Sequence, residues 1–181
     1  MSRWVHLLSA FLNNSAYFGG AVAVVGGDVF DATSDTFVNN SATYGGGAVA
    51  VFGGGVIAAT VDTFVNNSAI NGGAVYLSGG APLIAAGDTF KRDRAATGGA
   101  VFESSATVNV SNAGFSSDTA TSFGGAVYAN RGAVAAEFSR FTNSSATSGG
   151  ALYESHAVVN IVILSKTLAF RCLGSLLRAV S

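Results

Sequence analysis

The sequence predicts an all-β fold: a single-stranded parallel β-helix, or solenoid, of about six coils. The first observation is a fixed period, because a phenylalanine followed by a turn-forming stretch recurs at intervals of 26, 27, 26, 25 and 26 residues. The second is that three short strands and three corners need about 25 residues, which matches the period. The third is that no repeat contains the long periodic apolar segment of a leucine-rich or helical repeat. The recurring phenylalanines are Phe11, Phe37, Phe64, Phe90, Phe115 and Phe141.

Composition excludes several classes of protein. Of the 181 residues, 49% are apolar and 10% are charged, which is not the composition of a disordered tail. The formal net charge of −1 gives no electrostatic reason to expect nucleic acid or an anionic membrane as a partner. No apolar run approaches the ~18 residues of a membrane helix, and the first residues contain no convincing signal peptide. Cys172 is the single cysteine, so an internal disulfide cannot form.

The elements follow one another in the same order in every repeat. Residues 1–10 are a lead-in, in which we expect Trp4 and Leu7 to form a partial strand or a lid over the first coil. Across 11–165, each repeat has a Phe segment, an Ala-Val segment such as 74–77, and a segment rich in Val, Ile or Leu such as 83–84. Asn-Asn-Ser, a Gly-Gly pair and a second Gly cluster separate the segments and break regular structure. We therefore expect three strands in each coil.

Stacking of equivalent residues ~4.8 Å apart predicts side-chain columns. The phenylalanines form one internal column, and the residues after Gly-Gly-Ala form a second. Asn at the first corner tolerates left-handed backbone, and its amide can hydrogen-bond along the stack. The Asn column begins Asn14, Asn40, Asn67 and continues as Asp93, Asp118 and Ser144. Glycine pairs permit positive φ and close backbone approach at Gly19, Gly20, Gly46, Gly47, Gly72, Gly73, Gly98, Gly99, Gly124, Gly125, Gly149 and Gly150.

Three aspartates lie two residues before successive phenylalanines, at Asp35, Asp62 and Asp88. A straight strand would point them inward with the phenylalanines, and a buried stack of unpaired carboxylates is costly. We therefore expect a corner between Asp and Phe, with the carboxylates in solvent. Like charges one rung apart also make the three residues a weak candidate site for Ca²⁺, and no other metal or cofactor is predicted.

The repeat pattern decays after Gly150. Residues 166–181 carry Ala169, Leu173, Leu176 and Val180 at helical spacing, which predicts a short amphipathic helix that caps the open end of the solenoid. The alternative is that this divergent tail is not native coding sequence. Uncovered first and last rungs would favour end-to-end self-association.

Two short elements alternate along the chain: Phe-x-x-Asn, as in Phe37-Val38-Asn39-Asn40, and Gly-Gly-Ala followed by Val or Leu. Their alternation over 11–165 resembles the polymorphic outer membrane protein repeat of chlamydial autotransporter passengers. The resemblance implies a right-handed parallel β-helix of the pectin lyase-like kind, surface exposure, and adhesive or structural work. The first element is altered at Asp93 and Asp118 and ends in Ser144 in the last copy. We expect a fragment or a relative of such a surface protein.

An aromatic residue recurs three positions after the second glycine in four successive repeats: Tyr76, Phe102, Tyr128 and Tyr153. If this ladder faces outward, it could bind a glycan or a flat ligand by stacking. If it faces inward, it belongs to the core, and this interpretation is favoured.

For the other candidate sites a structural role is a better explanation than a functional one. Lys91, Arg92 and Arg94 form the one basic cluster, which a solvated turn with local ion pairing explains. His6 and His156 have no cysteine or carboxylate nearby in the sequence at the spacing of metal ligands. We expect Cys172 to be a buried apolar thiol. Five Asn-x-Ser sequons follow largely from the corner pattern, at Asn13, Asn39, Asn66, Asn109 and Asn143.

The sequence as a whole favours a non-enzymatic surface or extracellular repeat module, similar to an adhesin or a passenger. A glycan or a cell-surface protein is the expected partner. The alternative is a β-helix polysaccharide lyase or hydrolase, which would need clustered carboxylates and a basic residue in one groove.

Overall fold

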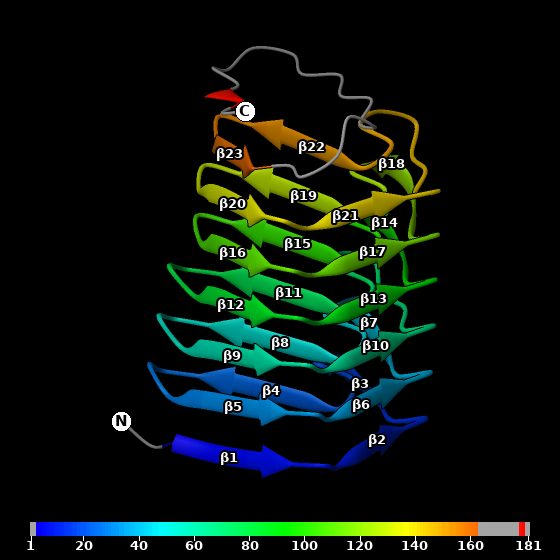
Figure 1. Cartoon of the computed structure of the whole chain (residues 1–181). Coiled ribbons are helices and arrows are strands. Elements are labelled where there is room, and N and C mark those ends of the chain that lie inside the picture. Colours follow the sequence, from blue (N-terminus) through cyan, green and yellow to red (C-terminus); the bar gives the residue numbers. More distant parts are fainter. Residues whose placement is uncertain (1–2, 163–177, 180–181) are drawn as a thin grey trace.

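The computed structural model describes residues 3–162 and 178–179, with side chains placed for residues 8–162. In this part of the chain the regular structure is entirely β, and every strand pairing is parallel. The chain winds upward through stacked coils, and corresponding strands lie directly above one another (Figure 1). The predicted fold class is therefore confirmed: the chain forms a right-handed parallel β-helix of about six coils.

Each full coil passes through four sheets, which we name C, D, A and B in chain order. In the second coil these strands are β7 (Ser41–Gly45), β8 (Val49–Phe52), β9 (Val56–Thr60) and β10 (Thr63–Val65). Sheet A also contains β1 (Arg3–Leu7), β5 (Val29–Thr33), β12 (Pro82–Ala86), β16 (Thr107–Ser111), β20 (Ala133–Glu137), β23 (Val158–Val162) and β24 (Arg178–Ala179). Sheet B also contains β2 (Ala10–Leu12), β6 (Thr36–Val38), β13 (Thr89–Lys91), β17 (Gly114–Ser116) and β21 (Arg140–Thr142).

Sheet D carries the Ala-Val segments. Besides β8 it contains β4 (Val22–Val25), β11 (Val75–Ser78), β15 (Val101–Ser104), β19 (Val127–Asn130) and β22 (Leu152–Ser155). Sheet C is made of the pair β3 (Ser15–Phe18) and β7 and the pair β14 (Arg94–Thr97) and β18 (Thr119–Phe123). Isolated bridges at Ser68, Asn71, Ser145 and Ser148 continue this sheet in the other coils.

Sheet C adds a fourth β segment to the coil, so the expectation of three strands per coil was wrong. The segment between the Asn corner and the glycine pair is short and rich in Ser, Ala and Thr. It lacks the β-branched and aromatic alternation by which a strand is recognised in sequence. Its pairing is imposed by the stacked coils on either side.

At the first end of the solenoid a strand of sheet A begins the stack, whereas at the other end only one short strand lies within the described residues. Residues 3–7 form β1, which pairs with β5 in the same register as the later rungs of sheet A. The predicted cap at residues 166–181 lies outside the described residues except for β24, which pairs with β23 through Asn160 and Ile161.

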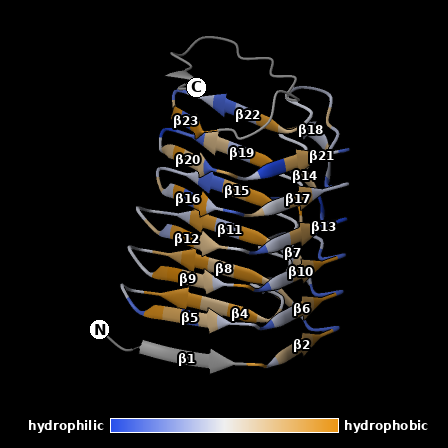
Figure 2. Cartoon of the chain, viewed as in Figure 1, coloured by the Kyte–Doolittle hydropathy of each residue, from blue (hydrophilic) through white to orange (hydrophobic). Residues whose placement is uncertain are grey.

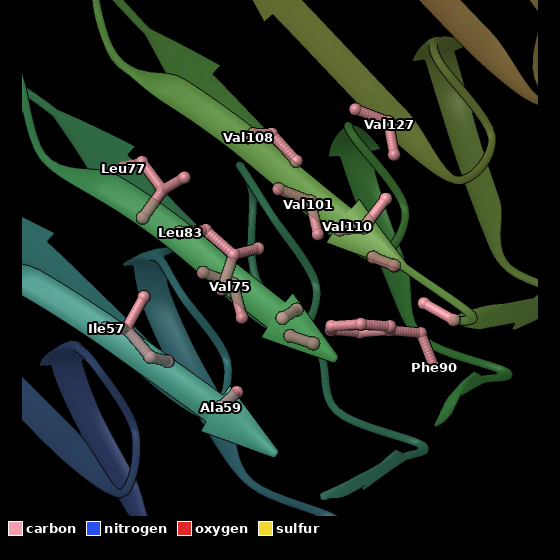
Figure 3. Packing of buried hydrophobic residues seen from close by; sticks show 14 of the residues in the cluster. Ile57, Ala59, Val75, Leu77, Leu83, Phe90, Val101, Val108, Val110 and Val127 are labelled. Carbon is pink, nitrogen blue, oxygen red and sulfur yellow. The ribbon is translucent and has the colours of Figure 1, made fainter. Parts of the chain in front are cut away.

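The phenylalanine column is the centre of the core. Adjacent rings from Phe11 to Phe141 stack with centroids 4.7 or 4.8 Å apart and planes within 4° of parallel. Phe37, Phe64, Phe90 and Phe115 are completely buried. Figure 3 shows Phe90 near the valines and leucines that sheets A and D direct into the same interior, among them Val75 and Leu83. The predicted internal aromatic column is thus confirmed.

The second apolar column also lies inside the coil. Its central members Val49, Val75, Val101 and Val127 are fully buried, and Leu152 is nearly so. Hydrophobic residues are concentrated in the strands of sheets A and D, while the corners beyond sheet B are hydrophilic (Figure 2). This distribution leaves one hydrophobic core, to which sheets A, B and D contribute the clustered side chains.

The glycine pairs serve two different requirements. The first glycine of each pair is left-handed, as at Gly46 with φ of 66°. The second has no room for a side chain, because a Cβ on Gly47 would collide with the carbonyl oxygen of Gly73 in the next coil. The corner between sheets C and D therefore needs glycine for both conformation and space at the first position, as at Gly46, and for space at the second, as at Gly47.

Candidate functional site

The aromatic ladder lies on the outer surface of sheet D. Tyr76, Phe102, Tyr128 and Tyr153 are in register on β11, β15, β19 and β22, and their neighbours along each strand point into the core. Each ladder residue is half-buried. The inward interpretation favoured by sequence was wrong for these residues. The strand alternation decides the face, because Val75 and Leu77 already occupy the interior on both sides of Tyr76.

The rings of the ladder stack on one another. Successive centroids are 5.1, 5.1 and 5.7 Å apart, and the ring planes are within 12° of parallel. Further aromatic rings from sheets C and D extend the cluster at both ends, with Phe18 4.9 Å from Phe52 and Phe123 4.7 Å from Tyr153. We call this surface the aromatic face; it consists of Tyr17, Phe18, Tyr44, Phe52, Tyr76, Phe102, Phe123, Tyr128 and Tyr153.

Stacking determines which part of each ring is available to a partner. Along the ladder the flat faces are covered by neighbouring rings, so solvent meets ring edges and tyrosine hydroxyls. Burial raises the pKa of Tyr76, although a hydrogen bond with Ser78 opposes the shift. Burial likewise raises the pKa of Tyr128, with smaller contributions from Tyr153 and Glu103. Tyr76 and Tyr128 therefore stay neutral at physiological pH, and their hydroxyls can donate or accept a hydrogen bond.

The aspartate column lies inside the coil, contrary to the expected solvated corner. Asp35, Asp62 and Asp88 are each 1% exposed. The corner falls one residue earlier, at the left-handed Ser34, Val61 and Gly87, so the aspartates enter the coil beside the phenylalanines. No sequence rule signalled that corner, because its residue type differs in every repeat.

A hydrogen bond to the neighbouring coil makes this burial tolerable. The Asp35 amide donates to Asp62 Oδ1 and the Asp62 amide to Asp88 Oδ1, both at 2.6 Å. Burial raises the pKa of Asp62 to about 6 and that of Asp88 to about 7, partly offset by these backbone hydrogen bonds. The carboxyl groups thus cap backbone N–H groups inside the coil. For the described side chains, no group of three or more His, Cys, Asp or Glu residues could hold a metal ion.

The Asn column forms the predicted ladder of amides. Asn14 Nδ2 donates to Asn40 Oδ1 at 2.9 Å, and Asn40 Nδ2 donates to Asn67 Oδ1 at 3.1 Å. The left-handed residue is the one before the ladder position, at Asn13, Asn39 and Asn66, rather than the ladder residue itself. The ladder asparagines are therefore selected for hydrogen bonding, and their predecessors for backbone conformation.

Sequence reasoning missed two buried glutamates on sheet D. Glu103 is fully buried, and its carboxylate accepts from the Ala106 amide at 2.6 Å and from the Asn130 amide at 2.9 Å. Glu154 accepts from the Ala157 amide at 3.1 Å. The recurring tetrapeptide Glu-Ser-x-Ala was the available signal, because it replaces the glycine-rich turn of other repeats. Figure 2 shows hydrophilic residues on β15 and β22 within an otherwise hydrophobic sheet. Burial raises the pKa of Glu103 to about 7.

The remaining sequence candidates do not converge on one site. Lys91, Arg92 and Arg94 are exposed at the corner between sheets B and C, whereas Asp88 is inside the coil at the other end of β13. His156 is exposed and contacts Ser155 Oγ at 3.1 Å. Of the sequon asparagines, Asn13, Asn39, Asn109 and Asn143 are exposed and Asn66 is half-buried. The His6 side chain and Cys172 lie outside the described residues.

Comparison with known protein families gives a match within one repeat. A family model described as the Chlamydia polymorphic membrane protein repeat matches residues 36–51, which run from β6 to β8. Within residues 36–51 the chain is therefore similar to this polymorphic membrane protein repeat. The matched stretch contains the Asn corner and the glycine pair, and both recur in the other coils. Neither the curated proteins nor the solved structures gave a match. None of the described residues forms a helix that could cross a membrane.

Proposed function

We propose that this chain is a non-enzymatic β-helix module of a surface or outer-membrane protein, and that its aromatic face adheres to a protein on another surface. The outward position of the aromatic ladder carries the proposal. Nine aromatic residues gather on sheets C and D, including Tyr17 and Tyr44, which are 61% and 39% exposed. The similarity of residues 36–51 to the polymorphic membrane protein repeat supports the surface setting.

The geometry of the ladder favours a protein over a glycan. A sugar ring binds aromatic side chains through their flat faces, and here the stacked neighbours cover those faces. Tyrosine edges and hydroxyls at the surface instead resemble the contact residues of protein-binding surfaces. Stacking also holds the rings in place before binding, which reduces the side-chain entropy lost on association.

The non-enzymatic part of the proposal rests on where the carboxylates lie. The candidate lyase or hydrolase chemistry needs a carboxylate and a base that face the same solvent-filled groove. Asp35, Asp62 and Asp88 are instead buried and bonded to backbone, and Glu103 caps a turn. Their placement supports a structural role for these acids.

Adhesion of coated beads to cultured cells tests the contact surface. Beads carrying the Tyr128→Ala, Tyr153→Ala double variant should detach at lower shear than beads carrying the wild-type chain. Phe138→Ala is the matched control, because Phe138 is an exposed aromatic residue at the corner between sheets A and B. Pretreating the cells with protease should abolish wild-type adhesion, and pretreating them with glycosidases should not. Equal adhesion of the double variant and the wild type would contradict the proposal.

Protease shaving of intact producing cells tests the surface setting separately. A repeat-specific antibody should detect a band that disappears on shaving while a cytoplasmic marker is retained. A fully protected band would remove the surface part of the proposal.

A further inference from the structure

The Asn ladder requires a hydrogen-bond donor at every rung. Asn40 Nδ2 donates to the Phe11 carbonyl oxygen of one adjacent coil at 2.9 Å and to Asn67 Oδ1 of the other at 3.1 Å. Asn67 Nδ2 repeats this pattern with the Phe37 carbonyl oxygen and Asp93 Oδ1, both at 3.1 Å. The amide nitrogen thus bridges two acceptors in neighbouring coils.

Asp93 and Asp118 occupy the next two rungs of the same column. Each supplies the acceptor that an asparagine would supply. The backbone N–H of Asn67 donates to Asp93 Oδ1 at 2.7 Å, and the backbone N–H of Asp93 donates to Asp118 Oδ1 at 3.0 Å. Both residues are completely buried, and the second carboxyl oxygen of each has no hydrogen-bond partner. That oxygen is the counterpart of the asparagine amide nitrogen.

An ionised carboxylate is a poor substitute for the amide at this position. Asn67 Nδ2 donates to the carbonyl oxygen of Phe37 and to the carboxyl group of the next rung. If Asp93 follows the same register, the corresponding partners of its Oδ2 are two acceptors, the Phe64 carbonyl oxygen and the carboxyl group of Asp118, and a donor is needed there. A protonated Oδ2 restores the donor and removes a charge from a dry interior, where an isolated charge costs several kcal/mol. A neutral aspartic acid is therefore nearly isosteric with asparagine in this ladder.

Backbone N–H groups, among them those of Lys91 and Ser116, partly offset the charges of the two acids, but the neighbouring side chains supply no buried positive charge. One neighbouring coil offers Asn66, Asn67 and Ser68, and the other side of the pair offers Ser144, whose buried hydroxyl also has no partner. The residues flanking Asp118, namely Ser116, Ser117 and Thr119, are uncharged. The basic side chains Lys91, Arg92 and Arg94 on the same corner are exposed to solvent.

We propose that Asp93 and Asp118 are neutral carboxylic acids in the folded coil, so that they continue the Asn ladder and make this part of the solenoid more stable at mildly acidic pH than at alkaline pH. The device is independent of the aromatic face, which lies on other sheets. The folded module therefore becomes more stable as its surroundings become acidic.

The direction of the titration agrees with this geometry. Burial, and then the charge of Asp118, raise the pKa of Asp93 well above its ordinary value, and burial raises the pKa of Asp118 to about 7. Because the folded pKa lies above the unfolded value, the stabilisation is complete below the unfolded pKa and is lost as pH rises through the folded pKa. Each proton released on unfolding increases the unfolding constant up to ~10-fold per pH unit within that window.

Substitutions that restore the repeat pattern test the proposal on the full chain. Asp93→Asn, Asp118→Asn and the double variant should unfold at higher urea concentration than wild type at pH 8, and this difference should be smaller at pH 5 and shrink further as pH falls toward 4. Asn67→Asp adds a third acid to the column and should lower the urea midpoint at pH 8 much more than at pH 5. Glu137→Gln, at an exposed acid on sheet A, should change neither the midpoint nor its pH dependence.

The comparison between variants isolates the pair from the other buried acids, which also titrate. The double variant should retain a weaker pH dependence, smaller by up to two protons than that of wild type. The infrared spectrum of wild type minus that of the double variant at pH 6 should contain a carboxylic-acid C=O band, because the other buried acids contribute equally to both spectra. An unchanged pH dependence, or the absence of that band, would overturn the proposal. Stabilisation of wild type by added Ca²⁺ at pH 8, absent in the double variant, would also overturn it, because the pair would then hold a cation.

Discussion

Removing one ring from the middle of the phenylalanine column should destabilise the solenoid more than removing a ring from its end. Phe64 is completely buried and stacks on Phe37 and Phe90 at 4.8 Å on both sides. Phe→Ala in a packed core costs about 3–5 kcal/mol, and each aromatic pair contributes about 0.5–1.5 kcal/mol. We expect Phe64→Ala to lose ~4–5 kcal/mol. Phe141 is 8% exposed and has one stacking partner in the column, Phe115, so Phe141→Ala should lose ~3 kcal/mol.

Urea unfolding followed by circular dichroism measures both variants. A loss of ~4 kcal/mol corresponds to a decrease of roughly 8–16 °C in Tm for a chain of this size. Thr63→Ala, on the outer surface of the same strand, is the control and should change stability by less than ~0.5 kcal/mol. Because coils in a solenoid can unfold one at a time, hydrogen exchange in β6, β10 and β13 should locate the loss around the missing ring. A loss below ~2 kcal/mol for Phe64→Ala, or one equal to that of Phe141→Ala, would refute the continuous column.

Three further predictions address other features of the coil. Gly47→Ala should abolish folding or lower Tm severely, since its Cβ collides with backbone of the next coil, whereas Gly54→Ala, which has open space but a φ of 77°, should cost only ~1 kcal/mol in urea unfolding. Asn40→Ala should cost ~1–3 kcal/mol, because it leaves the Asn14 backbone N–H, the Asn14 side-chain amide and the Phe11 carbonyl oxygen of the preceding coil without these partners; parallel urea curves would show it. Asp88→Asn keeps the acceptor for the Asp62 amide and removes a group whose folded pKa is about 7, so its urea midpoint should exceed that of wild type at pH 8 and approach it at pH 5.

Much of the candidate site could not be predicted, for reasons that particular residues make clear. Tyr76 and its stacked partners alternate along their strands with buried neighbours. The sequence shows this alternation, but it does not show which of the two sets of residues faces the core. Asp62 was predicted to be solvated, because a carboxylate is costly to bury. The sequence does not show that its Oδ1 accepts a hydrogen bond from the backbone N–H of Asp35 in the neighbouring coil. Glu103 lies at a position occupied by Val51 and Leu77 in other coils. Its two backbone partners come from different coils: Ala106 lies in the turn after β15, and Asn130 ends β19.

The sequence by itself determined the solenoid, the number of coils, the phenylalanine column and the Asn ladder. It could do so because a repeat of fixed length places identical residues one above another, so that the period alone predicts which side chains meet. Only the tertiary structure decided where the chain turns, that sheet C completes the coil, that the aspartates are inside and that the aromatic ladder is outside. Those features depend on left-handed residues of differing type and on hydrogen bonds between coils. Both arise from neighbouring rungs in space, and a single repeat read along the chain does not contain them.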